Sequence, residues 1–336
     1  MSAGMRILRS PWPRFREWAT SAPHAVRSMS LLRILYGLGV LVLIVPSYGD
    51  RSYLWGAASF WVDPIAGRSG NPLFGVIFRK DSPALFDLVF LAMIIVVLLF
   101  IVGFKTRFVT PVLFVLFTAL GANNPYATNG GDNLYRITLV FLMFADLSRH
   151  FSVDAWLRAR RRRRGLEARS PWLPGWLTSA LHNAALVLCC YQIILVYVAS
   201  GLYKLQGYEW IEGSGFYYAL VIPQFQIYPG INELIWQSSL VVMIATWVSV
   251  WGQLLFPIGL LWKPLRIVMI LLLACMHLGI AVLLGLWPFS LAMIALDMLF
   301  IRDGSWARLA RGCGELWART VQAGRRLFAV EPDPVA

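Results

Sequence analysis

A lysine ends a long apolar run, and an amine in that position can serve as a base or as an anchor. The stretch from Tyr197 to Gly213 reads YVASGLYKLQGYEWIEG. In a helix, one face of this stretch would carry Tyr197, Ser200, Gly201 and Lys204. Small and polar residues on one face of a membrane helix contact other helices rather than lipid. Lys204 is therefore either an anchor that reaches the headgroups or a working group in a pocket.

A histidine lies inside another apolar run. His277 is about 12 residues into that run, which places it about 18 Å from the inner membrane face at the helical rise. Its helical face is otherwise small, with Ala274, Ala281 and Gly285. Alone, such a histidine is more often a core residue bonded to a backbone carbonyl. As catalytic residues, Lys204 and His277 would come from separate helices into one dry pocket near the outer surface.

Polar residues flank a short loop that we expect at the same depth. They are Asn123, Asn124, Asn129, Asp132 and Arg136. In a structural role, Asp132 would cap the following helix with help from Asn129, and Arg136 would pair with Asp132 one turn away. In the alternative role, some of them would join two aromatic residues to bind a cofactor. These predicted binding residues are Asn124, Asp132, Arg136, Tyr197 and Trp210, although Trp210 also fits an ordinary interfacial aromatic.

The composition indicates a membrane protein. Of 336 residues, 58% are hydrophobic and 14% are charged, whereas soluble domains carry about 25% charged residues. The net charge of +13 comes in short basic blocks between apolar runs, as the positive-inside rule expects, so we expect a lipid bilayer and no nucleic acid as partner. The four cysteines lack metal-ligand spacing and predict neither a zinc site nor a disulfide framework.

The apolar runs predict an all-α fold, a polytopic transmembrane helix bundle. A span needs about 20 mostly apolar residues, and we expect about eight such spans. They lie near 29–48, 84–103, 107–123, 133–148, 180–203, 237–262, 265–285 and 287–302. The even-numbered connections are basic and the odd ones are poor in Lys and Arg, which predicts that both termini are cytoplasmic. We expect an integral multi-pass protein of a bacterial inner membrane.

Both ends of the chain are expected to lie in the membrane interface. Residues 1–28 are basic and aromatic and indicate an interfacial segment rather than a cleaved signal peptide. Residues 303–336 predict a basic amphipathic helix followed by a tail. The bundle at 29–302 would be the one folded domain between them.

Three charged residues are expected near the inner face. Arg33 lies early in the first span, and Asp146 and Asp297 lie late in spans that run inward. Buried charges of opposite sign are normally paired, so we expect an ion pair of Arg33 with one aspartate that ties the bundle together.

Several segments resemble one family, the HTTM membrane domain, which includes the membrane half of vitamin K-dependent gamma-carboxylase. SGLYKLQGYEWIEG from Ser200 resembles its lysine-bearing motif, and RILYG from Arg33 fits its first-span signature. NNPYATNGGDNLYRITLVFLMFADLSRHFSVD from Asn123 looks like its third-to-fourth-span region. MHLGIAVLLGLWPFSLAMIALDMLF from Met276 resembles its histidine-bearing late span. The resemblance covers roughly residues 25–305.

The resemblance implies a reaction and a cofactor. In the carboxylase, a lysine amine acts as base on reduced vitamin K at the outer side, and the oxygenated quinol then deprotonates a glutamate that captures carbon dioxide. Lys204 matches that lysine, His277 matches a late-span histidine, and the implied cofactor is a reduced vitamin K or menaquinone-type quinol. Removal from water favours the neutral form of an amine, and an apolar pocket suits a quinone.

Two departures change the expected substrate. The carboxylase has a histidine in an Asn-His-Ser-Tyr segment, where this chain has Asn-Gly-Gly-Asp at 129–132. The sequence also lacks the large lumenal half that binds the protein substrate, so we do not expect carboxylation of a dedicated protein.

Three functions therefore remain open. The first is a carboxylase-like or quinol-dependent membrane enzyme. The second is a non-enzymatic maturation or immunity partner for a small secreted peptide, as in toxin maturation, which would bind that peptide or a partner membrane protein. The third is a transporter, which would need inverted repeats or broken helices, and Gly and Pro residues near 252–264 could supply a break.

Overall fold

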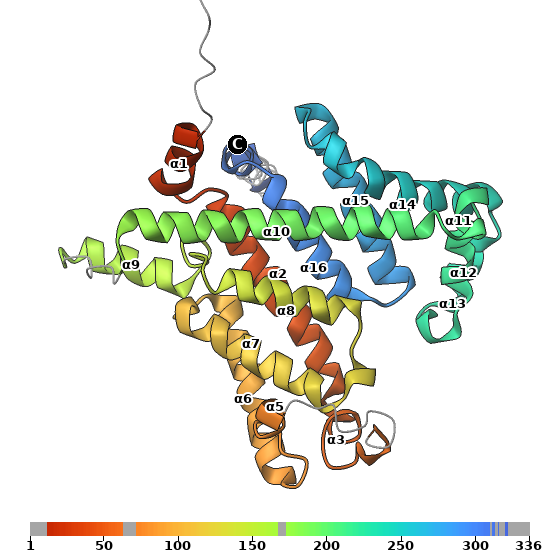
Figure 1. Cartoon of the computed structure of the whole chain (residues 1–336), viewed down its shortest axis with the longest axis horizontal. Coiled ribbons are helices and arrows are strands. Elements are labelled where there is room, and N and C mark those ends of the chain that lie inside the picture. The colour runs from red at the N-terminus through yellow and green to blue at the C-terminus, as the bar shows by residue number, and fades with distance from the viewer. Residues whose placement is uncertain are drawn as a thin grey trace, which may run out of the picture.

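The computed structural model describes residues 12–62, 72–166 and 173–309, together with 311, 312, 315, 320 and 321. In this part of the chain all regular structure is helical, as predicted (Figure 1). Six of the described helices are long and apolar enough to cross a membrane.

Two helices that are far apart in sequence form the centre of the bundle. The helix α2 (Val26–Ile44) and the helix α16 (Trp287–Asp297) run side by side (Figure 1). Gly37 and Gly39 make α2 narrow, because a Cβ at Gly37 would collide with Ile101 and one at Gly39 would collide with the Tyr135 hydroxyl. Small residues on α2 therefore let neighbouring helices approach closely.

The first half of the bundle packs on one side of α2. The helix α6 (Pro83–Val102) contacts α2 and α7 (Thr106–Asn123), and α7 contacts α8 (Gly130–Leu142). Gly103 ends α6 in the left-handed conformation, with φ of 71°, which glycine adopts without steric cost. The carboxylate of Asp154 then accepts backbone hydrogen bonds from Lys105 and Thr106 and caps α7.

The second half packs on the other side of the centre. The 30-residue helix α10 (Gly175–Lys204) crosses the molecule and packs on α14 (Ser239–Gly259), as Figure 1 shows. The helix α15 (Lys263–Leu283) lies between α14 and α16. Pro257 lies inside α14, which continues to Gly259, so this proline does not interrupt the helix.

All eight expected spans coincide with helices, but two of these helices are short. The helix α8 has 13 residues and ends at Leu142 rather than at residue 148. The helix α16 has 11 residues and is extended by the 3-10 turn η5 (Met298–Phe300). The other six match the predicted ranges within a few residues.

Shorter helices cover the two ends of the bundle. After α10 come α11 (Tyr208–Glu212), α12 (Gly215–Val221) and α13 (Pro229–Trp236). At the other end lie α1 (Trp12–Ser21) and α9 (Val153–Arg163). The remaining short elements are η1 (Pro46–Tyr48), α3 (Arg51–Leu54), η2 (Phe60–Val62), α5 (Pro72–Gly75), η3 (Pro125–Ala127) and η4 (Pro223–Phe225).

The segment that follows the bundle contacts the beginning of α2. The backbone of Arg27 donates to the carboxylate of Asp303, and the Trp306 indole donates to the hydroxyl of Ser28. Residues 303–309 are helical, as expected, and most of the predicted helix beyond them lies outside the described residues. The aromatic side chains of α1, among them Trp12 and Phe15, are exposed, as an interfacial helix requires.

The expected ion pair of Arg33 with an aspartate is wrong. The buried Arg33 guanidinium donates to the backbone carbonyls of Phe100, Ile101 and Phe151 instead. Phe100 and Ile101 lie in the last turn of α6, where carbonyls lack the usual amide partner four residues later and can accept from a side chain. The role of Arg33 is still structural, but it closes a helix terminus and does not neutralise a buried acid.

Candidate functional site

Lys204 is held in place at the end of α10. Its Nζ donates to Oε1 of Gln253 on α14 at 2.8 Å and lies 5.1 Å from the ring centre of Trp210 on α11. Lys204 is half-buried, and Gln253 is buried. An anchoring lysine would extend into the headgroups, whereas this amine is kept between a buried amide and an aromatic face.

The sequence positions this amine through the small face of α10. Tyr197 and Gly201 on that face are buried. A Cβ at Gly201 would lie 2.6 Å from Cγ of Leu254, so only glycine allows α10 and α14 to approach this closely. The close approach brings Gln253 within reach of Lys204, and it confirms that this face contacts other helices.

A second polar group lies about two helical turns further into the bundle. The Tyr197 hydroxyl donates to Oδ2 of Asp297 on α16 at 2.8 Å and lies 3.1 Å from Nε2 of His277 on α15. All three side chains are almost fully buried, with exposed fractions of 1% or less. We call these three residues the Tyr–His–Asp cluster. It joins three separate helices at one point.

Aromatic rings exclude water from the Tyr–His–Asp cluster. The Phe256 ring meets Tyr197 edge-on at 5.0 Å between centroids, and the Phe289 ring meets His277 at 5.6 Å. Two buried atoms in the cluster, Nδ1 of His277 and Oδ1 of Asp297, have no hydrogen-bond partner among the described residues. Unpartnered buried polar atoms are rare and costly, and a functional role is one explanation for them.

The hydrogen bonds define which protons the cluster holds. Tyr197 has one hydroxyl proton, which it donates to Asp297. His277 must then donate from Nε2 to the Tyr197 oxygen, and its Nδ1 carries a free lone pair. A proton accepted at Nδ1 would let the Nε2 proton pass to Tyr197 and the Tyr197 proton pass to Asp297. The cluster can therefore hold one additional proton without separating charge.

The two groups lie on the same face of α10 at different depths. Lys204 follows Tyr197 by seven residues, about 10.5 Å along the helix axis. The structure thus brings together four of the seven predicted site residues, with Lys204 beside Trp210 and Tyr197 beside His277.

The other three predicted residues form a second group around η3. Asn124 donates to the carbonyl of Leu54, and its Oδ1 accepts from the backbones of Tyr126 and Ala127. In this position the Asn124 side chain fastens the loop before α8 to α3.

Asp132 and Arg136 belong to the beginning of α8. Asp132 accepts from the Asn129 backbone at 2.7 Å and completes a capping box. Arg136 donates to Asn133 at 3.3 Å. Both side chains border a crevice of about 10 Å³, a volume that holds at most one water molecule. The capping role is confirmed, with Asn129 as the N-cap and Asp132 in the first turn. The expected pairing of Arg136 with Asp132 is wrong, because Arg136 donates to Asn133 instead.

Two residues of the site were not predicted from the sequence. Gln253 in α14 was not singled out, and Asp297 was assigned to the inner face beside Arg33. Counting along α16 from Trp287 places Asp297 about 15 Å from the beginning of that helix, where its side chain meets Tyr197 of α10. Among the described residues, no group of three His, Cys, Asp or Glu side chains could hold a metal ion.

Comparison with known proteins identifies the family. The family model of the HTTM domain matches residues 22–306. This range agrees with the 25–305 of the resemblance and contains Lys204, Gln253 and the Tyr–His–Asp cluster. No curated protein and no solved structure matches the chain. Because the matched range covers most of the chain and includes the six long apolar helices found among the described residues, the protein is an integral membrane member of the HTTM domain family.

Proposed function

We propose that the protein is a quinol-dependent membrane enzyme in which Lys204 acts as the base. The observation that carries the proposal is the fixed Lys204 amine, held by Gln253 and Trp210 above a buried cluster with unpartnered polar atoms. A surface anchor needs neither feature. The basic end of the bundle, with α9, would face the cytoplasm, and Lys204 would face the outside of a bacterial inner membrane.

The residues near Lys204 suit an aromatic diol. The amine can accept a proton from an acidic hydroxyl, and the Trp210 face can stack on a flat ring. Lys204 and Trp210 would therefore hold a quinol of the reduced vitamin K or menaquinone type. Such a cofactor supplies reducing equivalents and, after reaction with oxygen, a strong base.

The protein's own groups would hold and move protons at two depths. The neutral amine of Lys204 would accept a proton at Nζ, while Gln253 keeps the amine in one orientation. The Tyr–His–Asp cluster would accept a second proton at Nδ1 of His277 and store it on Asp297. The rings of Phe256 and Phe289 would keep water away, so that the proton held by the cluster does not exchange with solvent.

The proposal is tested with protein purified in native lipid particles. Mass spectrometry should find a copurifying menaquinone or ubiquinone, and the particles should oxidise added menadiol with dissolved oxygen as the electron acceptor. Loss of a general base reduces the rate by about 10²–10⁴-fold, so Lys204→Ala should lose menadiol oxidation to that extent while remaining folded. The control is Lys263→Ala, at the beginning of α15, which should oxidise menadiol at the rate of the unaltered protein.

The opposite result would point to a non-enzymatic role. If Lys204→Ala oxidises menadiol as fast as the unaltered protein, Lys204 is not the base. If no quinone copurifies and a small membrane protein does, the protein is a maturation or immunity partner for a peptide. The acidic and aromatic residues around α11, among them Glu212 and Tyr217, are the observation that favours this second function.

A further inference from the structure

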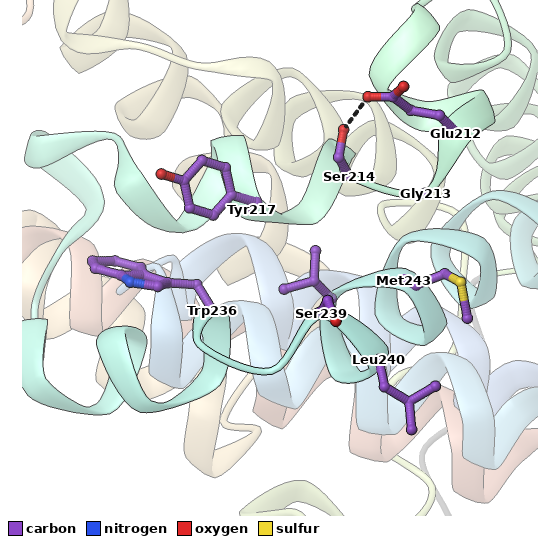
Figure 2. Close-up of a pocket in the computed structure, with 9 residues that line it drawn as sticks. Glu212, Gly213, Ser214, Tyr217, Trp236, Ser239, Leu240 and Met243 are labelled. Atoms are coloured by element: carbon purple, nitrogen blue, oxygen red, sulfur yellow. Dashed lines mark hydrogen bonds between the residues drawn. The ribbon is translucent and has the colours of Figure 1, made fainter.

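A pocket of about 500 Å³ lies among the short helices that follow α10. Figure 2 shows it between the turn from α11 to α12 on one side and the junction of α13 with α14 on the other. It is lined by Glu212, Gly213, Ser214, Tyr217, Trp236, Ser239, Leu240, Val242 and Met243. We call it the cap pocket. Its volume is in the range of a small-molecule or single side-chain site.

The cap pocket has an acidic end and an aromatic end. The Ser214 hydroxyl donates to Oε1 of Glu212 at 2.9 Å, which fixes the carboxylate at one end (Figure 2). The rings of Tyr217 and Trp236 meet edge-on at the other end, with centroids 6.2 Å apart. A carboxylate has several acceptor sites, so Glu212 keeps the capacity to bind a cation.

The walls of the cap pocket are tied to α14. The Phe216 backbone donates to the hydroxyl of Thr246 at 2.9 Å, and the Trp247 indole donates to the Ile211 carbonyl at 3.3 Å. Gly213 has φ of 95° and no room for a Cβ without contact with Met243 at 3.0 Å. The turn between α11 and α12 is therefore held in one conformation, and the site is preformed.

The charge around the cap pocket is opposite to that of the whole chain. Residues 205–238 contain three glutamates and no Lys, Arg, His or Asp, while the chain carries a net charge of +13. The same segment contains eight aromatic residues. A negative local field attracts cations, and aromatic faces bind them by cation–π contacts.

We propose that the cap pocket binds a basic side chain of a peptide. The ammonium or guanidinium would pair with Glu212, and the aliphatic stem would lie against Tyr217 and Trp236. This proposal does not depend on Lys204 acting as a base. Trp210, which contacts Lys204, precedes Glu212 by two residues on α11, so a peptide held at Glu212 would have its neighbouring residues beside the candidate site.

The test measures binding of charged and neutral peptides to the full chain. The protein is reconstituted in nanodiscs of uncharged phosphatidylcholine, and the probe is labelled acetyl-Phe-Arg-Phe-amide, followed by fluorescence anisotropy. Its partner probe carries citrulline, which has the shape of arginine without the charge. One partly exposed ion pair plus a cation–π contact predicts about tenfold tighter binding of the arginine peptide.

Matched variants locate the charge that is responsible. Glu212→Gln should abolish the preference for arginine, whereas Glu209→Gln, on the same helix but outside the pocket, should keep it. Lys204→Ala should also keep it, so failure of the catalytic proposal would not affect this result. Unchanged thermal unfolding shows that each variant is folded.

Three results would overturn the proposal. One is equal binding of the arginine and citrulline peptides to the unaltered protein. Another is an equal loss of the preference for the arginine peptide in Glu209→Gln and Glu212→Gln, which would indicate a diffuse effect of surface charge. The third is displacement of the arginine peptide by glycerophosphocholine at comparable concentration, which would make the pocket a lipid headgroup site.

Discussion

Removing the hydroxyl group of Tyr197 should destabilise the bundle, because this oxygen contacts two other buried polar side chains. Tyr197→Phe deletes the oxygen that contacts both Asp297 and His277. Asp297 would then have no hydrogen bond to either carboxylate oxygen among the described residues, because Oδ1 is already unpartnered. A buried polar group without a partner costs its full desolvation energy.

The size of the effect follows from the two lost contacts. A hydrogen bond to a charged group contributes about 1.5–3 kcal/mol and a neutral one about 0.5–1.5 kcal/mol. We therefore expect Tyr197→Phe to lower the free energy of unfolding by about 2–4 kcal/mol. The matched control is Tyr135→Phe, which is equally buried and loses only one hydrogen bond, to the carbonyl of Pro288. It should cost about 1 kcal/mol.

The assay is equilibrium unfolding in mixed micelles, followed by circular dichroism. A double-mutant cycle with Asp297→Asn isolates the contact, because a neutral amide is less costly to leave unpaired than a carboxylate. The double variant should be less destabilised than the sum of the single variants, with a coupling of about 1–3 kcal/mol. Equal effects of Tyr197→Phe and Tyr135→Phe, or strict additivity in the cycle, would refute the assignment of the cluster.

Two further substitutions test the positions of helices. Gly201→Ala places a Cβ 2.6 Å from Leu254 and should destabilise the protein by about 1–3 kcal/mol in the same unfolding assay, whereas Gly279→Ala meets no atom within 4 Å and should be neutral or stabilising. Equal changes in the free energy of unfolding for Gly201→Ala and Gly279→Ala would contradict the close packing of α10 on α14. Asp132→Ala should cost about 1 kcal/mol by removing the bond from Asn129; loss of quinone binding without loss of stability would instead make Asp132 a ligand residue.

Much of the fold follows from local patterns in the sequence. Apolar runs of about 20 residues must bury their backbone hydrogen bonds in helices, so six spans are predictable within a few residues. The caps of α8 are equally local, because Asn129 and Asp132 act within one turn. The small face that ends at Lys204 is also predictable, since helical periodicity alone places Tyr197 and Gly201 on one side.

The partners of the buried polar groups were decided only by the tertiary structure. The depth of a residue follows from counting along its helix, but its partner depends on the rotation and tilt of neighbouring helices. For this reason Asp297 meets Tyr197 rather than Arg33, and Arg33 binds carbonyls at the end of α6. Gln253 becomes a partner of Lys204 only because Gly201 lets α14 approach α10. Local sequence thus determined which residues share a helix face, and long-range packing determined which faces meet.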